Sequence, residues 1–102
     1  MSVIVLVRFE GDPTVLLRTA LENEELVMKI VTNAKTQYGA IHHQFIGGIG
    51  EVAALDEWPS QTAFETFFEA NGVDIKTLTD LAGVTAQPTI EVWDRLDTPD
   101  RF

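Results

Sequence analysis

The chain has 102 residues, with seven Lys and Arg against sixteen Asp and Glu, so its formal net charge is −9. An acidic surface repels phosphate backbones and anionic membranes, which argues against nucleic acid or a membrane as a partner. The chain has no cysteine, which excludes disulfides, thiolate metal ligands and thiol nucleophiles, and it has no apolar run long enough to span a bilayer. We expect a soluble, cytoplasmic protein with one domain over residues 1–95 and a C-terminal tail over residues 96–102.

The first half of the chain predicts a strand followed by helical structure. Residues 2–9 are rich in β-branched side chains, and Asp12 with Pro13 is typical of a helix N-cap followed by proline in the first turn. Apolar residues then recur at helical spacing in two stretches on either side of Asn23. Asn23 either caps a second helix or kinks the first, and the pattern leaves both open.

The first of these stretches carries four residues that we expect on one buried face: Leu16, Leu17, Ala20 and Leu21. The second stretch ends at Gly39, a typical helix terminator.

The second half of the chain predicts a hairpin, two helices and a last strand. Residues 40–46 and 51–58 read as strands around a turn centred on Gly48 and Ile49. Ser60 is expected to cap a helix, and Asp74 a further short helix that ends at Gly83. Residues 89–94 form the last predicted strand.

This order, β-α-β-β-α-β, predicts an α+β, ferredoxin-like fold. Right-handed crossovers give a split sheet of four antiparallel strands in the spatial order 4-1-3-2, with the helices on one face. The other face carries apolar side chains and no helices, so we expect a homodimer. The residues that suggest this interface are Ile4, Leu6, Ile46 and Leu55.

The hairpin decides which side chains face the helices. With the turn at Gly48 and Ile49, His43 opposes Ala54 and Phe45 opposes Val52. Strand alternation then places His43, Asp56 and Trp58 on the helix-covered side and His42 on the other side, towards the dimer interface. A slip of one residue would exchange His43 for His42.

The segment from Asp56 to Phe64, which reads Asp-Glu-Trp-Pro-Ser-Gln-Thr-Ala-Phe, resembles the dimeric α/β-barrel superfamily. Within it, the segment is similar to the antibiotic-biosynthesis-monooxygenase-like group, in which an acidic residue, a spacer and Trp often end the third strand. The resemblance implies a dimeric barrel and a cofactor-independent oxygenase acting on aromatic or quinol-like molecules. Some members of the superfamily degrade haem, but of their site pattern only Trp58 is present.

The candidate catalytic residues are His43, as proton acceptor, and Asp56, which would orient the imidazole. The alternative for His43 is a satisfied structural histidine. Candidate ligand-binding residues are aromatic and can equally be core: Tyr38, Trp58, Phe64, Phe67 and Phe68. Two oppositely directed histidines are a poor donor set, so we expect no metal site, no haem and no other cofactor.

Two functions remain open at this point. One is a cofactor-independent monooxygenase-like enzyme with an apolar pocket for an aromatic or quinone-like molecule. The other is a noncatalytic dimer that binds a small molecule or a protein partner. Fold alone does not separate them.

Overall fold

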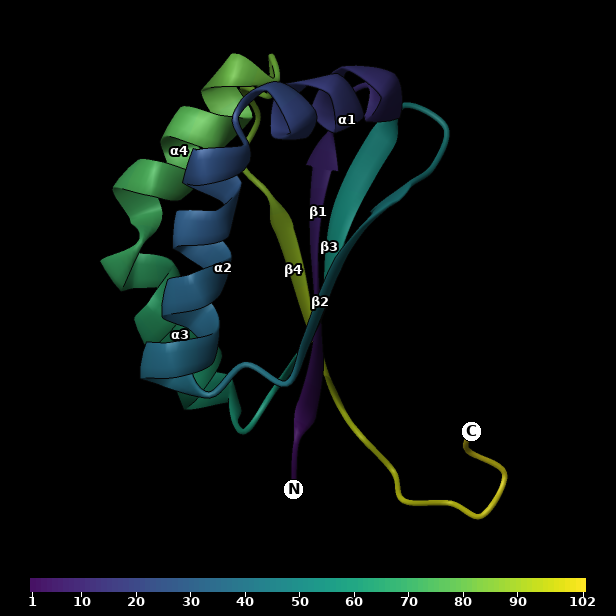
Figure 1. Ribbon diagram of the computed structural model, residues 1–102. Helices are drawn as coiled ribbons and strands as arrows, with labels where there is room; N and C mark the ends of the chain where they lie inside the picture. Colours follow the sequence, from purple (N-terminus) through teal and green to yellow (C-terminus); the bar gives the residue numbers. More distant parts are fainter.

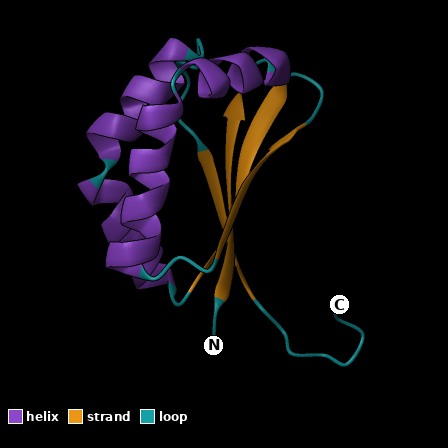
Figure 2. Cartoon of the chain, in the orientation of Figure 1, coloured by secondary structure: helices purple, strands orange, loops and turns teal.

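A four-stranded antiparallel sheet carries all of the helices on one of its faces (Figures 1 and 2). The computed structural model describes every residue, 1–102. The strand order is β2-β3-β1-β4, which confirms the predicted α+β fold and its 4-1-3-2 order. The elements in chain order are β1 (Val3–Glu10), α1 (Pro13–Glu22), α2 (Glu24–Tyr38), β2 (His42–Gly47), β3 (Glu51–Trp58), α3 (Gln61–Ala70), α4 (Gly72–Leu81) and β4 (Thr89–Asp94).

Three predicted helix boundaries are confirmed in atomic detail. The Asp12 carboxylate accepts a hydrogen bond from the backbone N–H of Thr14 at 2.8 Å, and Pro13 occupies the first turn of α1. The Ser60 hydroxyl accepts from the N–H of Ala63 at 3.1 Å at the start of α3. Gly39 ends α2 in the left-handed conformation, which glycine adopts at no steric cost.

Of two further boundaries, one was left open by the sequence and one was predicted wrongly. A second helix starts after Asn23, which occupies the N-cap position of α2, but its side-chain amide donates back to the carbonyl of Thr19 at 2.9 Å and makes no capping hydrogen bond. The prediction that Asp74 caps a helix is wrong, because α4 begins at Gly72. Asp74 instead lies in the first turn of α4 and pairs with Lys29 of α2 at 3.0 Å.

The predicted buried face of α1 is only partly correct. Leu16 and Thr19 are buried, whereas Leu17 and Leu21 are 62% and 71% exposed. Helix α1 lies across one end of the sheet (Figure 1), so it buries a narrower stripe than a helix packed flat on a sheet would.

The hairpin register differs from the prediction by two residues. His43 pairs with Asp56 and Phe45 with Ala54, and Gly47 is the last paired residue of β2, opposite Val52. The strands are therefore joined by a longer loop than a two-residue turn. A Cβ on Gly47 would lie 2.7 Å from Pro13 Cβ, so glycine lets β2 pass under the start of α1 at this point.

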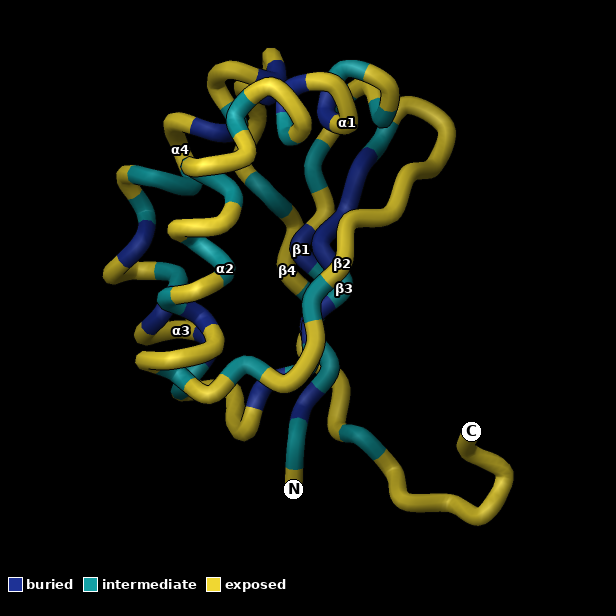
Figure 3. Tube along the Cα trace, in the orientation of Figure 1, coloured by how far each residue is buried: buried dark blue, intermediate teal, exposed yellow.

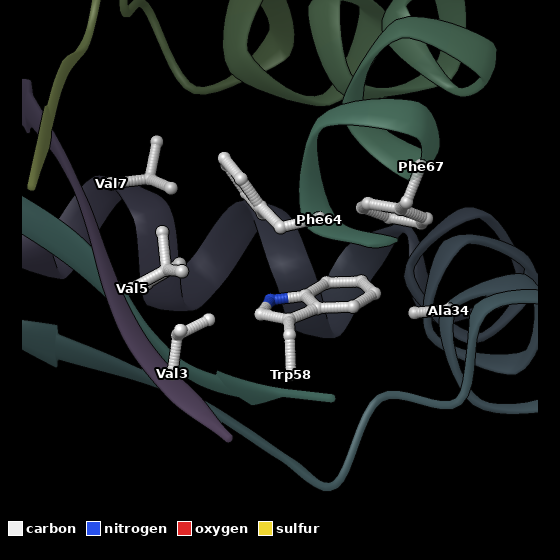
Figure 4. Packing of buried hydrophobic residues seen from close by; sticks show 8 residues of the cluster. Val3, Val5, Val7, Ala34, Trp58, Phe64 and Phe67 are labelled. Atoms are coloured by element: carbon white, nitrogen blue, oxygen red, sulfur yellow. The ribbon is translucent and has the colours of Figure 1, made fainter. Parts of the chain in front are cut away.

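The helix-covered face of the sheet holds the core. Val3, Val5 and Val7 of β1 are buried beside Trp58 of β3, and the close-up shows the indole between these valines and the phenylalanines of α3 (Figure 4). The tube coloured by burial shows β1 and β3 largely buried and β2 largely exposed (Figure 3). The sheet thus has a covered centre and a more open β2 edge.

No helix covers the opposite face of the sheet, and residues 95–102 extend beyond β4 away from the helices (Figure 1). No helix is long and apolar enough to cross a membrane.

Candidate functional site

A cavity of about 330 Å³ lies between the covered face of the sheet and the helices. Of its 24 lining residues 19 are hydrophobic, and the elements that line it are β1, β2, β3 and all four helices, but not β4. This volume lies near the lower end of the roughly 300–1,000 Å³ that is typical of pockets for small ligands, so a small flat aromatic molecule is a suitable occupant by size.

The polar end of this cavity is formed by His43 of β2 and Asp56 of β3. The imidazole Nδ1 lies 2.6 Å from Asp56 Oδ1, and both residues line the cavity. They are directly opposite each other in the ladder, rather than diagonal as predicted. The two-residue register difference keeps both on the covered face, because side chains alternate with a period of two.

Asp56 is also held by Trp58. The indole Nε1–H donates to Asp56 Oδ2 at 3.3 Å, so each carboxylate oxygen has its own partner. The Asp56 side chain is only 8% exposed. A buried carboxylate needs hydrogen-bond partners to offset the cost of its desolvation. Trp58 and His43 supply one partner for each oxygen of Asp56.

This hydrogen bond defines the useful tautomer of His43. With its proton on Nδ1, donated to Asp56, a neutral imidazole leaves Nε2 as an acceptor. Nε2 has no hydrogen-bond partner in the chain, and the His43 side chain is 28% exposed. The ring also packs edge-on against Phe45 at 4.9 Å between centroids, which restricts its rotation. His43 thus presents an imidazole of fixed orientation at the wall of an apolar cavity.

Aromatic side chains form the wall opposite β1. Trp58 packs against Phe64 and Phe67 with centroids 5.7 and 4.9 Å apart, and Phe64 packs edge-on against Phe68 at 5.4 Å (Figure 4 shows the first three). All four line the cavity. Trp58, Phe64 and Phe67 are buried, whereas Phe68 is half-buried, so core and cavity wall are the same structure here.

Tyr38 is a candidate ligand-binding residue whose alternative role is packing at the helix end. It does not line the cavity, and its ring packs edge-on against Phe67 at 5.7 Å. Tyr38 therefore supports the wall from behind, in the helix-end packing role.

Strand alternation directs His42 to the opposite side from His43, although His42 also contributes to the cavity lining, and its Nε2 lies 3.0 Å from the Gln44 amide oxygen. Its neighbour across the ladder is Glu57, which accepts hydrogen bonds from Ser2 and Arg95. The Ser2 hydroxyl first, and then the Arg95 guanidinium, hold the pKa of Glu57 below its ordinary value. The sequence alone did not predict this network, because Ser2 and Arg95 are 93 positions apart. They come close together only through the pairing of β1 with β4.

The sequence analysis also missed the contribution of α2 and α4. Val27, Ile30 and Val31 of α2 and Ile75 and Leu78 of α4 line the cavity. Their helical spacing predicted a buried face, but spacing does not distinguish a packed core from the wall of a cavity.

No three His, Cys, Asp or Glu side chains lie close enough together to hold a metal ion. On β1, the cavity-facing positions are Val7 and Phe9, which offer no ligand atoms.

The arrangement of strands and helices is found in several solved structures. ActVA-Orf6, a monooxygenase from Streptomyces coelicolor solved with nanaomycin D, superposes with a TM-score of 0.67 at 16% identity, over 98% of this chain and 93% of that one. SnoaB, a cofactor-independent oxygenase from Streptomyces nogalater, gives 0.61 at 16% identity over 98% of each chain. The chain has the fold of the antibiotic biosynthesis monooxygenase-like proteins.

This fold was predicted from the segment between Asp56 and Phe64, and the prediction is confirmed at the level of fold. Rv0793 from Mycobacterium tuberculosis is likewise similar, with a TM-score of 0.61 at 19% identity over 98% of this chain and all of that one. No protein-family model and no curated protein matches the sequence. At such low identity the monooxygenase-like fold is established, and activity has to be argued from the site.

Proposed function

We propose that the chain is a cofactor-independent monooxygenase-like enzyme that acts on an aromatic or quinol-like molecule. The observation that carries this proposal is the hydrogen bond between His43 and Asp56, 2.6 Å long, at the polar end of an otherwise apolar cavity. An oriented neutral imidazole in such a place is suited to accept a proton from a bound substrate.

The proposed reaction begins when Nε2 of His43 removes a proton from an acidic methylene or hydroxyl group of the ring system. Asp56 stabilises the imidazolium that forms, and Trp58 keeps the Asp56 carboxylate in position. The substrate anion is delocalised over the rings and can reduce dioxygen directly. For a methylene, one oxygen atom of O2 becomes the product carbonyl and the other leaves as water.

The apolar walls serve this chemistry in two ways. Flat rings fit against Trp58, Phe64 and Phe67, and burial of their surface supplies binding free energy of about 25 cal/mol per Å². The same side chains exclude water, which strengthens the interaction between His43 and Asp56 and protects a reactive anion. The descriptions of SnoaB and ActVA-Orf6 as oxygenases that share this fold support the reaction class.

We further propose that the active form is a cytoplasmic homodimer, joined through the uncovered face of the sheet. Ladder positions give this face a diagonal apolar stripe from β2 to β4, formed by Ile46, Ala53, Leu55, Leu6, Ile4 and Trp93. Trp93 is 61% exposed in the single chain. Ion pairs flank the stripe, Arg8 with Glu51 and Arg95 with Glu57, and would fix the register of two copies.

Oxygen uptake measured with a panel of anthrones and quinols, beside ligand-induced thermal shifts, tests the enzymatic proposal. We expect uptake with at least one compound that also raises the melting temperature. Compounds that stabilise the protein without any uptake would overturn the enzymatic proposal in favour of a noncatalytic binding dimer.

A further inference from the structure

A second cavity adjoins the one that His43 lines. It has a volume of about 500 Å³ and lies between α3, α4, β4 and the loop of residues 82–88. Six residues line both cavities and so form the wall between them: Phe9, Phe64, Phe68, Ile75, Thr79 and Val84. The two cavities are therefore neighbouring chambers separated by one layer of side chains.

The two chambers differ in chemistry. The first is lined by 19 hydrophobic residues out of 24, whereas seven of the 16 residues lining the second have polar side chains, and these include Thr85 and Gln87. Three carboxylates, Glu65, Glu69 and Asp80, face one cation, Lys76, which Asp80 already binds at 3.0 Å. The second chamber offers many hydrogen-bonding groups but repels anions.

Three apolar side chains of the wall between the chambers are only half-buried, Phe9, Ile75 and Phe68, and Phe68 is the one that continues the aromatic wall of the first chamber. Phe64 and Val84 are buried in the core, whereas Phe68 is half-buried and packs edge-on against Phe64 at 5.4 Å. Thr79 stands beside it as the only polar side chain in the wall, with its hydroxyl donating to the carbonyl of Lys76 at 3.1 Å. Its oxygen can still accept a hydrogen bond from a ligand that passes Phe68.

We infer that the ligand of this site is an uncharged aromatic molecule whose polar, hydrogen-bonding substituent passes Phe68 and occupies the second chamber. The inference rests on the proposed function for the placement of the rings beside His43. Beyond the proposed function, it states that the ligand carries a polar substituent, that this substituent lies in the second chamber, and that it has no negative charge. In such a ligand the aromatic rings occupy the apolar first chamber, and the polar substituent contacts the hydrogen-bonding side chains of the second.

Three probes with the same ring separate these features: 2-naphthol, 2-naphthyl β-D-glucoside and 2-naphthyl β-D-glucuronide. The glucoside adds a neutral polar group, and the glucuronide adds a group of the same size with a carboxylate. Calorimetric titration of the wild-type chain at pH 7.5 is expected to give glucoside binding at least as tight as naphthol binding. Glucuronide binding is expected to be at least tenfold weaker than glucoside binding.

Variants then locate the substituent. Phe68→Ala is expected to tighten glucoside binding severalfold relative to naphthol, and Phe68→Leu replaces it if the alanine variant fails to fold. Glu69→Lys is expected to tighten glucuronide binding about tenfold. Glu22→Lys makes the same change in net charge at an exposed residue that lines neither chamber, and it should leave the glucuronide affinity unchanged.

The outcomes separate this inference from the proposed function. If naphthol binds and His43→Ala weakens it, but the glucoside binds at least tenfold more weakly than naphthol, the inference is wrong and the proposed site stands. Equal responses of glucuronide binding to Glu69→Lys and Glu22→Lys would also overturn it. If none of the probes binds, the aromatic site itself is refuted.

Discussion

His43 is a candidate base for two reasons: it lines the cavity, and it is hydrogen-bonded to Asp56. The Asp56 carboxylate accepts the Nδ1 proton at 2.6 Å, which leaves Nε2 as the atom that can accept a substrate proton. Only the neutral imidazole offers this acceptor, so the proposed role depends on Asp56 holding the ring proton at Nδ1.

The first prediction concerns these two residues. His43→Ala should lower kcat about 10²–10⁴-fold, the usual contribution of a general base, and should lower the free energy of unfolding by about 1–3 kcal/mol, because one oxygen of the buried Asp56 carboxylate loses its partner. Asp56→Asn keeps the volume but can donate its amide to Nδ1, which would place the ring proton on Nε2 and remove the acceptor. Steady-state oxygen uptake and urea unfolding measure the two effects. Unchanged turnover in both variants would assign them a structural role.

Trp58 carries the second prediction, because it packs in the core and lines the cavity at once. Trp58→Phe should lower stability by about 1–2 kcal/mol and weaken binding of naphthol, since it removes ring surface and the donor to Asp56. Val5→Ala is the matched control, because Val5 is fully buried but does not line the cavity. Denaturant unfolding and calorimetry report the two effects. A loss of stability without any loss of binding would make Trp58 purely structural.

At the scale of the elements, the pairing of β1 with both of its neighbours brings Ser2, Glu57 and Arg95 together at one end of the sheet. The Ser2 hydroxyl, with Arg95 in addition, lowers the pKa of Glu57 from its ordinary value of 4.5. A carboxyl with a lowered pKa in the folded state stabilises the fold above its unfolded pKa, and this contribution is lost as the pH falls through the folded value.

The third prediction follows from the lowered pKa of Glu57. Glu57→Gln should be less stable than wild type at pH 7, and the difference in unfolding free energy should shrink as the pH falls below about 4, where the wild-type carboxyl also becomes neutral. Urea unfolding at a series of pH values measures it. The control is Glu65→Gln, an exposed carboxyl on α3. A difference that stays constant with pH would mean that Glu57 contributes through shape rather than charge.

The elements also show which sequence signals are reliable. Helix ends were predictable where a single residue determines them: the side chains of Asp12 and Ser60 each accept from one backbone N–H, and Gly39 adopts the left-handed conformation. The hairpin register was not predictable, because it depends on contact between Gly47 and Pro13 of another element. The predicted register was wrong by two residues, which leaves every side chain on the same face of the sheet. His43 and Asp56 were therefore placed on the correct face, although His43 was paired with the wrong residue of β3.

At the scale of the whole molecule, the sequence predicted the sheet order and its uncovered face, but it offered an apolar pocket only as part of one of two open functions. Helical spacing places Val31 and Phe68 inward, yet whether inward side chains fill the space or leave 330 Å³ open depends on how the helices sit on the sheet. Tyr38 is a further example: its aromatic character made it a candidate ligand-binding residue, but its ring packs against Phe67 and does not line the cavity.

The fourth prediction concerns assembly. Leu55→Glu places a charge in the middle of the uncovered sheet face, so it should convert a dimer at micromolar concentration into a monomer that still folds. Leu17→Glu is the matched control, because Leu17 is an exposed leucine on α1 away from that face. Light scattering after size-exclusion chromatography measures the mass. A wild-type monomer, or a dimer in both variants, would refute the proposed interface.

The central claim is that His43, oriented by Asp56, removes a proton from an aromatic substrate in the cavity. The most direct measurement is deuterium exchange at the methylene group of anthrone in D2O under argon, followed by mass spectrometry, because it reports proton removal before oxygen enters the reaction. We predict exchange faster than in buffer with the wild-type chain, slowed in Asp56→Asn and reduced to the buffer rate in His43→Ala. Wild-type exchange at the buffer rate, or equal acceleration by His43→Ala, would contradict the account.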